Sequence, residues 1–312
     1  MAGVKLDDGL RAVQLPKGQD PVRRVERAAS MRVIEVEKRE TKLQRKEFTN
    51  NSGWESDELL RGDTLVIDKA SGDPALLQIG LPAEDTARLR RLVLDAVAFR
   101  QLWDNVGERM SGITYQFATF GYKQRSPLRR RDCCSASLVN RTQPALYAEL
   151  ERFTSDVILP RFAEWLPGPH ARQMEACEAI RPEWRIGGDA PWTSGIINNT
   201  AQLQYHRDSR NITGSWSAML ALRQFVRGGH LHVPEYGATC EVADGELIFF
   251  CGSNLLHGVT PFSIRQFEKP RSYRYTIVWY PGAGMSTCLP WEEELAYGKR
   301  ARTVREERAG GR

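Results

Sequence analysis

The chain has 312 residues, of which 41% are hydrophobic and 27% are charged, so a disordered or collagen-like protein is excluded. The formal net charge is +5, but the final stretch, residues 299–312, carries six basic and two acidic side chains, which leaves the rest of the chain close to neutral. Net charge therefore gives no argument for a nucleic-acid partner, and such an argument must rest on local patches.

No apolar run approaches the roughly 20 residues that a membrane helix needs, and the N-terminus lacks the apolar core of a signal peptide. We therefore expect a soluble intracellular protein with no membrane partner, nuclear if the source is eukaryotic. The six cysteines are irregularly spaced, and we expect reduced thiols, with Cys133 and Cys134 buried. Two adjacent cysteines do not fit a zinc site.

The first half of the chain predicts isolated strands and two amphipathic helices. Residues 1–30 are polar and without pattern, and we expect a flexible segment there. The predicted elements that follow are a strand within 31–43, a hairpin over 64–80, and helices over about 84–106 and 144–166. Pro160 predicts a kink in the second helix.

After Pro182 the pattern changes to short runs rich in β-branched and aromatic residues, separated by Gly, Asn and Asp. Such runs favour an antiparallel barrel or jelly roll. We predict an α+β protein with a double-stranded β-helix core at about 183–282 and helices packed outside it. The predicted single domain covers 31–290, and 291–312 form a basic C-terminal tail.

Four of the five histidines lie in the β-rich region, and two of them sit in a pattern that suits a metal. In His206-Arg207-Asp208, strand alternation directs the imidazole and the carboxylate to one face. His257 follows a later apolar strand, and a barrel can return it to the first pair. Two imidazoles and one carboxylate form the facial triad of a non-haem Fe(II) site, with open positions for a co-substrate and O2.

Further features surround the predicted triad. A Gly-Gly turn precedes the strand that carries His230 and His232, and we expect both of these imidazoles to point outward and to be structural. Arg274 begins an apolar strand, with the Thr276 hydroxyl two residues on and on the same face. A buried guanidinium beside a hydroxyl suits the distal carboxylate of a dicarboxylate ligand.

Residues from about 192 to 280 resemble the TET/JBP family of 2-oxoglutarate/Fe(II)-dependent nucleic-acid base dioxygenases, through YHRDSRN, GGHLHVPEYG, LLHGVTPF and YRYTIVWY. The resemblance implies that His206, Asp208 and His257 bind iron. It also implies that Arg274 and Thr276 bind 2-oxoglutarate, and that Asn211 contacts the target base. The family's second co-substrate arginine has no match here, since residues 201–205 contain none.

If the substrate is a DNA base, the nucleotide must be flipped out of the duplex to reach the metal. Asn198 and Asn199, on a strand before the triad, are further candidates for reading the base, although turn or ladder roles are the alternative. Phosphates require basic residues on the same rim. The predicted clamp, for which a solvated basic face is the alternative, consists of Lys123, Arg125, Arg129, Arg130 and Arg131.

Each assignment has a structural alternative. His206 and Asp208 form an ordinary surface ion pair in that alternative, His257 is a hydrogen-bonded barrel histidine, and Arg265 or Arg271 replaces Arg274. Three classes of function follow. The first is hydroxylation of 5-methylcytosine, or alternatively thymine, in DNA, with methylated duplex as partner. The second is the same chemistry on a protein side chain or small molecule, and the third is a non-enzymatic β-barrel binding module.

Overall fold

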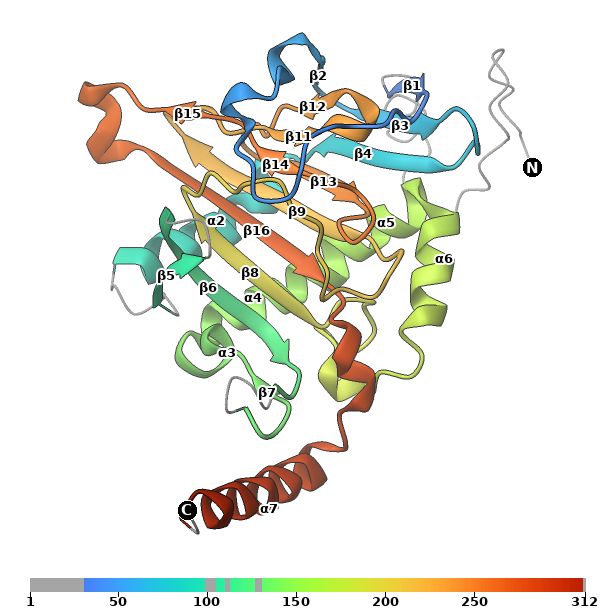
Figure 1. Cartoon of the computed structure of the whole chain (residues 1–312). Helices are drawn as coiled ribbons and strands as arrows, with labels where there is room; N and C mark the ends of the chain where they lie inside the picture. The colour runs from blue at the N-terminus through green and yellow to red at the C-terminus, as the bar shows by residue number, and fades with distance from the viewer. Residues whose placement is uncertain (1–30, 99–104, 110–112, 127–130, 311–312) are drawn as a thin grey trace.

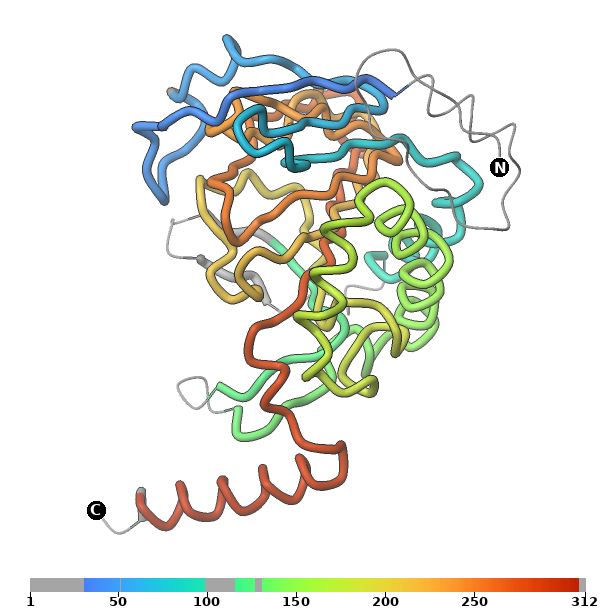
Figure 2. The backbone as a smooth tube through the Cα atoms, turned by 90° about the vertical axis from the view of Figure 1, so that its right-hand side faces the viewer, coloured from blue at the N-terminus to red at the C-terminus, as the bar shows by residue number. Residues whose placement is uncertain are grey.

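The structure is a computed structural model that describes residues 31–98, 105–109, 113–126 and 131–310. In this part of the chain a large sheet and a small sheet face each other, and helices cover the outer face of the large sheet (Figures 1 and 2). The architecture confirms the predicted α+β class with a jelly-roll core. None of the described helices combines the length and the apolar composition that crossing a lipid bilayer requires.

The large sheet is mostly antiparallel and provides the main wall of the core. In spatial order its strands are β1 (Arg32–Val36), β3 (Thr64–Asp68), β4 (Pro74–Gly80), β13 (Glu246–Phe250), β9 (Ser217–Gln224), β16 (Tyr273–Tyr280), β8 (Ser194–Asn199), β6 (Ile113–Lys123) and β5 (Asn105–Arg109), with β7 (Ser135–Ala136) beside β6. The predicted hairpin over 64–80 is the β3–β4 pair, whose turn is fixed by the Asp68 carboxylate accepting the N–H groups of Ala70 and Ser71.

The small sheet joins segments from both halves of the chain. Its strands are, in order, β14 (Gly258–Val259), β11 (Leu231–Val233), β12 (Ala238–Cys240) and β2 (Glu58–Leu60), and a separate pair is formed by β10 (Arg227–Gly228) and β15 (Phe262–Ser263). β2 runs parallel to β12, so the N-terminal segment completes this sheet.

The helices gather on the outer face of the large sheet, except the last, which extends away from the body (Figure 1). They are α2 (Ala83–Ala98), α3 (Leu138–Thr142), α4 (Pro144–Phe153), α5 (Leu159–Trp165), α6 (Pro167–Ala176) and α7 (Trp291–Gly310). A π-helical turn over Thr154–Ile158 joins α4 to α5. This irregularity directly precedes Pro160, which has no N–H to donate to the helix.

Two elements differ from the sequence prediction. The helix expected over 84–106 ends at Ala98, and Val106 lies in the strand β5. The apolar residues of the strand continued the helical spacing by coincidence, so the sequence pattern did not mark the end of the helix. The expected basic tail forms α7, whose first turn carries Glu292, Glu293 and Glu294. Acidic residues at a helix N-terminus stabilise the helix dipole. The predicted flexible segment 1–30 lies outside the described residues.

Strand alternation divides the core into two layers. On β9, Ala218, Leu220 and Leu222 face the helices, whereas Met219 and Ala221 face the small sheet. Since both faces are covered, the strand reads as a continuous apolar run. β16 follows the same rule: Ile277 and Trp279 pack among the helix-facing residues, and Arg274 and Thr276 therefore point between the two sheets.

The prediction that His230 and His232 point outward is wrong. His232 is 1% exposed, and its neighbours Leu231 and Val233 are buried as well. His230 is half-buried. The reason is that β11 is covered on both faces, by the large sheet on one side and by the N-terminal segment around Asp57 on the other.

The prediction that all six cysteines are reduced is also wrong. Cys134 and Cys288, 154 residues apart, form a disulfide with a Cα–Cα distance of 5.9 Å. Cys133 is half-buried and free, and Cys177, Cys240 and Cys251 are free thiols too. Spacing along the chain carries no signal for a pair that only the tertiary fold brings together.

Candidate metal centre and pocket

Three side chains from two separate segments, His206 with Asp208 and His257, converge in one place. His206 and His257 form a backbone bridge, with N–H···O distances of 2.9 and 3.0 Å, and their ring centroids lie 4.3 Å apart. The Asp208 N–H donates to the Gly252 carbonyl at 2.8 Å, and the Asp208 carboxylate lies 3.6 Å from His206 Nε2. One potential ligand atom of each residue lies within 4.8 Å of the others, so the predicted triad is brought together.

Both imidazoles are oriented by backbone carbonyls. His206 Nδ1 lies 2.8 Å from the Gln204 oxygen, and His257 Nδ1 lies 2.9 Å from the Leu255 oxygen. A proton on each Nδ1 is donated to these carbonyls, which leaves each Nε2 lone pair available to a metal ion. Two imidazole nitrogens and one carboxylate match the donor set that binds Fe(II) on one face. The residues present therefore fit an iron ion.

The Asp208 carboxylate is positioned by two neighbours. Asn211, 7% exposed, donates from Nδ2 to Asp208 Oδ2 and to Ser217 Oγ, at 3.3 Å each. A Cβ at Gly252 would lie 2.3 Å from Asp208 Oδ2, so a larger residue there would displace the carboxylate. Asn211, predicted to contact the base, thus has its amide group engaged by the triad. Sequence reasoning missed Gly252, whose only signal is a glycine directly after an apolar strand.

A pocket of about 930 Å³ opens over the triad. Its floor and one wall come from the large sheet, including Phe117, Asn198 and Thr276, and the opposite wall comes from Tyr205 and Val259 beside the ligands. The pocket thus lies between the two sheets, at the site predicted from the β region.

Arg274 is a buried cation without an acidic partner among the described residues. It is 1% exposed and lines the pocket; its Nη2 donates to the Gly229 carbonyl at 2.6 Å, and its Nε has no partner. Burial, together with the nearby Arg223, lowers the pKa of Arg274 to about 9, so the guanidinium stays protonated at neutral pH. A buried charge is unfavourable unless it is compensated. The site therefore favours an anionic group within the pocket.

The surroundings of Arg274 fit a carboxylate ligand. Thr276, 5% exposed, lies on the same face of β16 and accepts a hydrogen bond from Asn198 Nδ2 at 3.4 Å. A Cβ at Gly229 would lie 2.7 Å from Arg274 Nε, and the φ of Gly229 is +70°, so both space and backbone require glycine. Arg265 and Arg271, the alternatives from sequence, do not line this pocket.

The two candidate asparagines on β8 face opposite directions. Asn198 lines the pocket, whereas Asn199 donates to Gln116 Oε1 at 2.8 Å on the neighbouring strand β6 and does not line it. Successive residues of a strand point to opposite faces, so only one of the pair can reach a substrate. Asn199 has the ladder role that was the alternative.

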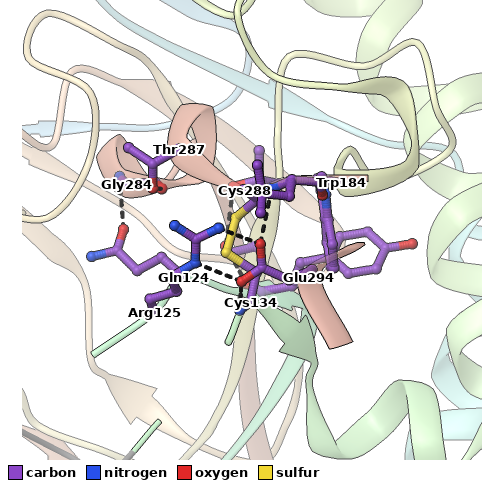
Figure 3. Close-up of a disulfide and its surroundings, with 12 residues drawn as sticks. Gln124, Arg125, Cys134, Trp184, Gly284, Thr287, Cys288 and Glu294 are labelled. Atoms are coloured by element: carbon purple, nitrogen blue, oxygen red, sulfur yellow. Dashed lines mark hydrogen bonds and ion pairs between the residues drawn. A yellow bond between two sulfur atoms is a disulfide. The ribbon is translucent and has the colours of Figure 1, made fainter. Parts of the chain in front are cut away.

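The predicted basic clamp separates into parts. Arg125 pairs with the fully buried Glu294 carboxylate, and its guanidinium lies 4.3 Å from the Tyr297 ring centroid, so it anchors α7 (Figure 3). Lys123 and Arg131 line the pocket. Arg129 and Arg130 lie outside the described residues.

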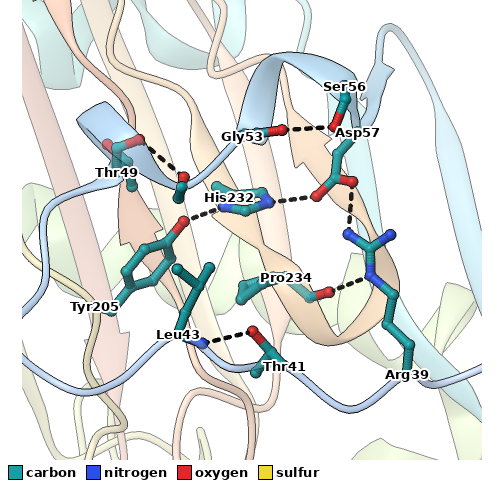
Figure 4. A network of polar contacts seen from close by, with 11 residues as sticks. Arg39, Thr41, Leu43, Thr49, Gly53, Ser56, Asp57, Tyr205, His232 and Pro234 are labelled. Atoms are coloured by element: carbon teal, nitrogen blue, oxygen red, sulfur yellow. Dashed lines mark hydrogen bonds and ion pairs between the residues drawn. The ribbon is translucent and has the colours of Figure 1, made fainter.

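A buried polar network ties the N-terminal segment to the segment that precedes the triad (Figure 4). The Tyr205 hydroxyl is hydrogen-bonded to His232 Nδ1, and His232 Nε2 lies 2.7 Å from Asp57 Oδ2. Arg39 closes the network, donating to Asp57 Oδ1 at 2.5 Å and to the Pro234 carbonyl at 2.9 Å. Burial lowers the pKa of His232. The network explains why His232 is inside, and it fixes the residue adjacent to His206.

No protein-family model and no curated protein sequence matches the chain. Solved structures do match. The structure of NgTET1 in complex with 5mC DNA aligns at 14% sequence identity over 83% of this chain and 85% of that chain, with a TM-score of 0.55.

A 2OG-Fe(II) oxygenase family oxidoreductase from Burkholderia pseudomallei aligns at 14% identity over 65% of this chain and 84% of that chain, with a TM-score of 0.39. OsALKBH1 aligns at 11% identity over 66% and 97%, also with a TM-score of 0.39. At these identities the similarity to NgTET1 establishes a shared fold, and it agrees with the jelly-roll core described above.

Proposed function

We propose that the protein is an Fe(II)- and 2-oxoglutarate-dependent dioxygenase that hydroxylates the methyl group of 5-methylcytosine in DNA. One observation carries the oxygenase part: a facial triad of His206, Asp208 and His257 shares a pocket with the uncompensated cation of Arg274. A metal site alone would suit many chemistries. The combination of an iron-type donor set and a buried carboxylate receptor suits a dicarboxylate co-substrate.

Each residue has a defined part. The triad would hold iron through two imidazole nitrogens and one carboxylate, and Arg274 and Thr276, which line the same pocket, would hold the distal carboxylate of 2-oxoglutarate. When bound there, iron with 2-oxoglutarate and O2 as co-substrates would supply the oxidation of a C–H bond to an alcohol. The walls of the pocket would orient the substrate carbon toward the triad.

Three features support a nucleic-acid base as substrate. The pocket of about 930 Å³ has room for a flipped nucleotide beside the co-substrate. Phe117, Tyr122 and Tyr280 line it, and aromatic side chains can stack on a base. The NgTET1 structure with the same fold was determined with 5mC DNA, and we extend that substrate to this chain as part of the proposal.

The test is nucleoside mass spectrometry of DNA incubated with the protein, Fe(II) and 2-oxoglutarate. Duplexes containing cytosine, 5-methylcytosine or 5-hydroxymethylcytosine are compared, and 5-hydroxymethylcytosine should appear from the methylated duplex only when 2-oxoglutarate is present. The His257→Ala variant, which lacks one triad ligand, should form none. Appearance of 5-hydroxymethyluracil in place of 5-hydroxymethylcytosine would identify thymine as the substrate.

Two results would contradict the proposal at different levels. If succinate forms while the DNA stays unchanged, the protein is an oxygenase, but its substrate is a protein side chain or a small molecule. Absence of Fe(II) binding by the wild-type protein, measured by calorimetry, would contradict the oxygenase itself.

A further inference from the structure

This inference rests on the proposed function and deepens it. The residues that line the pocket include seven basic side chains and one acidic side chain, Asp208, which belongs to the triad. Arg274 faces the co-substrate position. The other six basic residues that line the pocket have no part in the chemistry described so far: Arg45, Lys46, Lys123, Arg131, Arg207 and Arg210.

The six differ in whether the protein itself neutralises them. Arg207 pairs with Glu235 at 2.8 Å and donates to the Asn254 carbonyl. Lys123 and Arg131 have interactions within the chain. By contrast, no carboxylate among the described residues pairs with Arg45, Lys46 or Arg210, all three of which are exposed. These three cations are therefore available to an external anion.

Arg45 and Lys46 are held at the pocket by the backbone. The Lys46 N–H donates to the Tyr205 carbonyl at 2.8 Å, and the Tyr205 N–H donates to the Glu47 carbonyl at 2.9 Å. Lys46 thus pairs directly with the residue that precedes His206. The segment is secured further by Thr49 Oγ1, which donates to the Val259 carbonyl at 2.7 Å.

The backbone of Lys46 has a φ of 75°, in the left-handed region that non-glycine residues rarely adopt. Such conformations persist only where the surrounding structure imposes them, and they concentrate at functional sites. Here the hydrogen bonds to Tyr205 on both sides of Lys46 impose it. This conformation accompanies a lysine that is exposed and lines the pocket.

Arg210 lines the pocket from a second segment of the chain. It follows Asp208 by two residues, and its carbonyl accepts the Ala283 N–H at 2.9 Å, which ties the Asp208–Arg210 turn to the segment after β16. Lys46 pairs with the residue before His206, so cations reach the pocket that holds the triad from two separate segments, residues 45–46 and Arg210. A single small anion would need the cations of one segment only, whereas a polymer with a charge on every unit can bind the cations of both segments.

We propose that Arg45, Lys46 and Arg210 bind the phosphates on either side of the nucleotide whose base enters the pocket. Phosphate contacts fix the position of a nucleic acid without reading its sequence, and each contact releases counterions. The N-terminal segment is thereby part of the substrate site, although the sequence analysis found no motif around residues 45 and 46.

The test measures binding to a fluorescent 5-methylcytosine oligonucleotide by anisotropy, with the full chain and without added iron, at several NaCl concentrations. Removing one phosphate contact should reduce the slope of log K against log[salt] by about 1. Arg45→Gln/Lys46→Gln should therefore lower the slope by about 2, and Arg210→Gln by about 1. Lys69→Gln, at an exposed lysine that does not line the pocket, is the matched control and should bind like the wild type.

A second variant separates the effect of the Lys46 charge from the effect of its backbone conformation. Lys46→Gly removes the side chain but suits a positive φ, so it should fold at least as well as the wild type and still lose about one unit of slope. Calorimetry with 2-oxoglutarate should give wild-type affinity for every rim variant.

The outcomes distinguish the phosphate contacts from the DNA substrate itself. Unchanged slopes in the Arg45/Lys46 and Arg210 variants, with a wild type that binds DNA and forms 5-hydroxymethylcytosine, would overturn this inference alone. A wild type that shows no salt-dependent DNA binding would overturn the DNA substrate as well. Equal loss in the Lys69→Gln control would also overturn it, because the effect would then reflect net charge only.

Discussion

Two arginines that stand out in the sequence, Arg125 and Arg274, occupy contrasting environments. Arg125 meets Glu294, whose carboxylate is fully buried and also accepts the N–H groups of Cys134 at 2.6 Å and Leu289 at 2.8 Å (Figure 3). Within the part of the chain that the structure describes, the guanidinium of Arg274 donates a hydrogen bond to the Gly229 carbonyl and has no carboxylate partner. The first cation is neutralised inside the protein and stabilises the fold. The second is left for a ligand to neutralise.

The electrostatics express the same contrast. Burial alone would raise the pKa of Glu294, but the hydrogen bonds from Arg125 and the two backbone N–H groups outweigh it, and the pKa is lowered. Burial and Arg223 lower the pKa of Arg274, with no carboxylate to oppose them among the described residues. A buried charge therefore indicates a binding site only where its partner is missing.

The largest effect is expected from breaking the Arg125–Glu294 pair. Arg125→Met leaves a buried carboxylate uncompensated, so the free energy of unfolding should fall by about 3–5 kcal/mol. Urea denaturation at pH 7 measures it. Arg125→Met/Glu294→Gln, which removes the charge as well, should recover part of the loss. An Arg125→Met protein of wild-type stability that binds DNA more weakly would instead return this residue to the phosphate clamp.

The disulfide belongs to the same neutralised cluster, and its removal should have the next largest effect. Cys288→Ser should lower the free energy of unfolding by about 2–4 kcal/mol, because the unfolded chain loses a long cross-link. Dithiothreitol should destabilise the wild type equally. Cys133→Ser, at the free neighbouring cysteine, serves as control and should keep its sensitivity to dithiothreitol. A wild type that is indifferent to reductant would contradict the role of the bond.

Arg274→Met tests whether the arginine without a carboxylate partner binds the co-substrate. The affinity for 2-oxoglutarate should fall about 100-fold, about 2.7 kcal/mol, since a charged hydrogen-bonded pair with the carboxylate is lost. The free energy of unfolding should stay the same or rise, because an uncompensated buried cation is removed. Calorimetry and thermal unfolding measure the two quantities. Arg271→Met, at an exposed arginine outside the pocket, should change neither.

The smallest effect concerns His230, close to Arg274. Burial and the nearby arginines lower the pKa of His230 to about 4. The unfolded state, with a histidine pKa near 6.5, binds more protons below that pH, so stability is full above about 6.5 and falls toward pH 4. Allowing for the partial exposure of this side chain, the loss is about 1–2 kcal/mol. His230→Asn should flatten this part of the stability profile; an unaltered profile would assign it to other groups.

The sequence contained enough to predict the β core and the triad. Alternation within short strands is a local property, so it placed Arg274 and Thr276 on one face correctly, and the structure also brings His206, Asp208 and His257 together. The disulfide, the burial of His232 and the pairing of Arg125 depend on residues more than 150 positions away. Contacts of that kind leave no periodic trace in the sequence.

The parallel pairing of β2 with β12 has a consequence for biosynthesis. Residues 58–60 acquire their sheet partner only when residues 238–240 have left the ribosome, and the Asp57–His232 contact must wait as long. Contacts between such distant segments form slowly. Residues 58–60, which follow Arg45 and Lys46 in the sequence, must therefore remain without their sheet partner through most of translation. A chain that ends before β12 would lack this part of the small sheet.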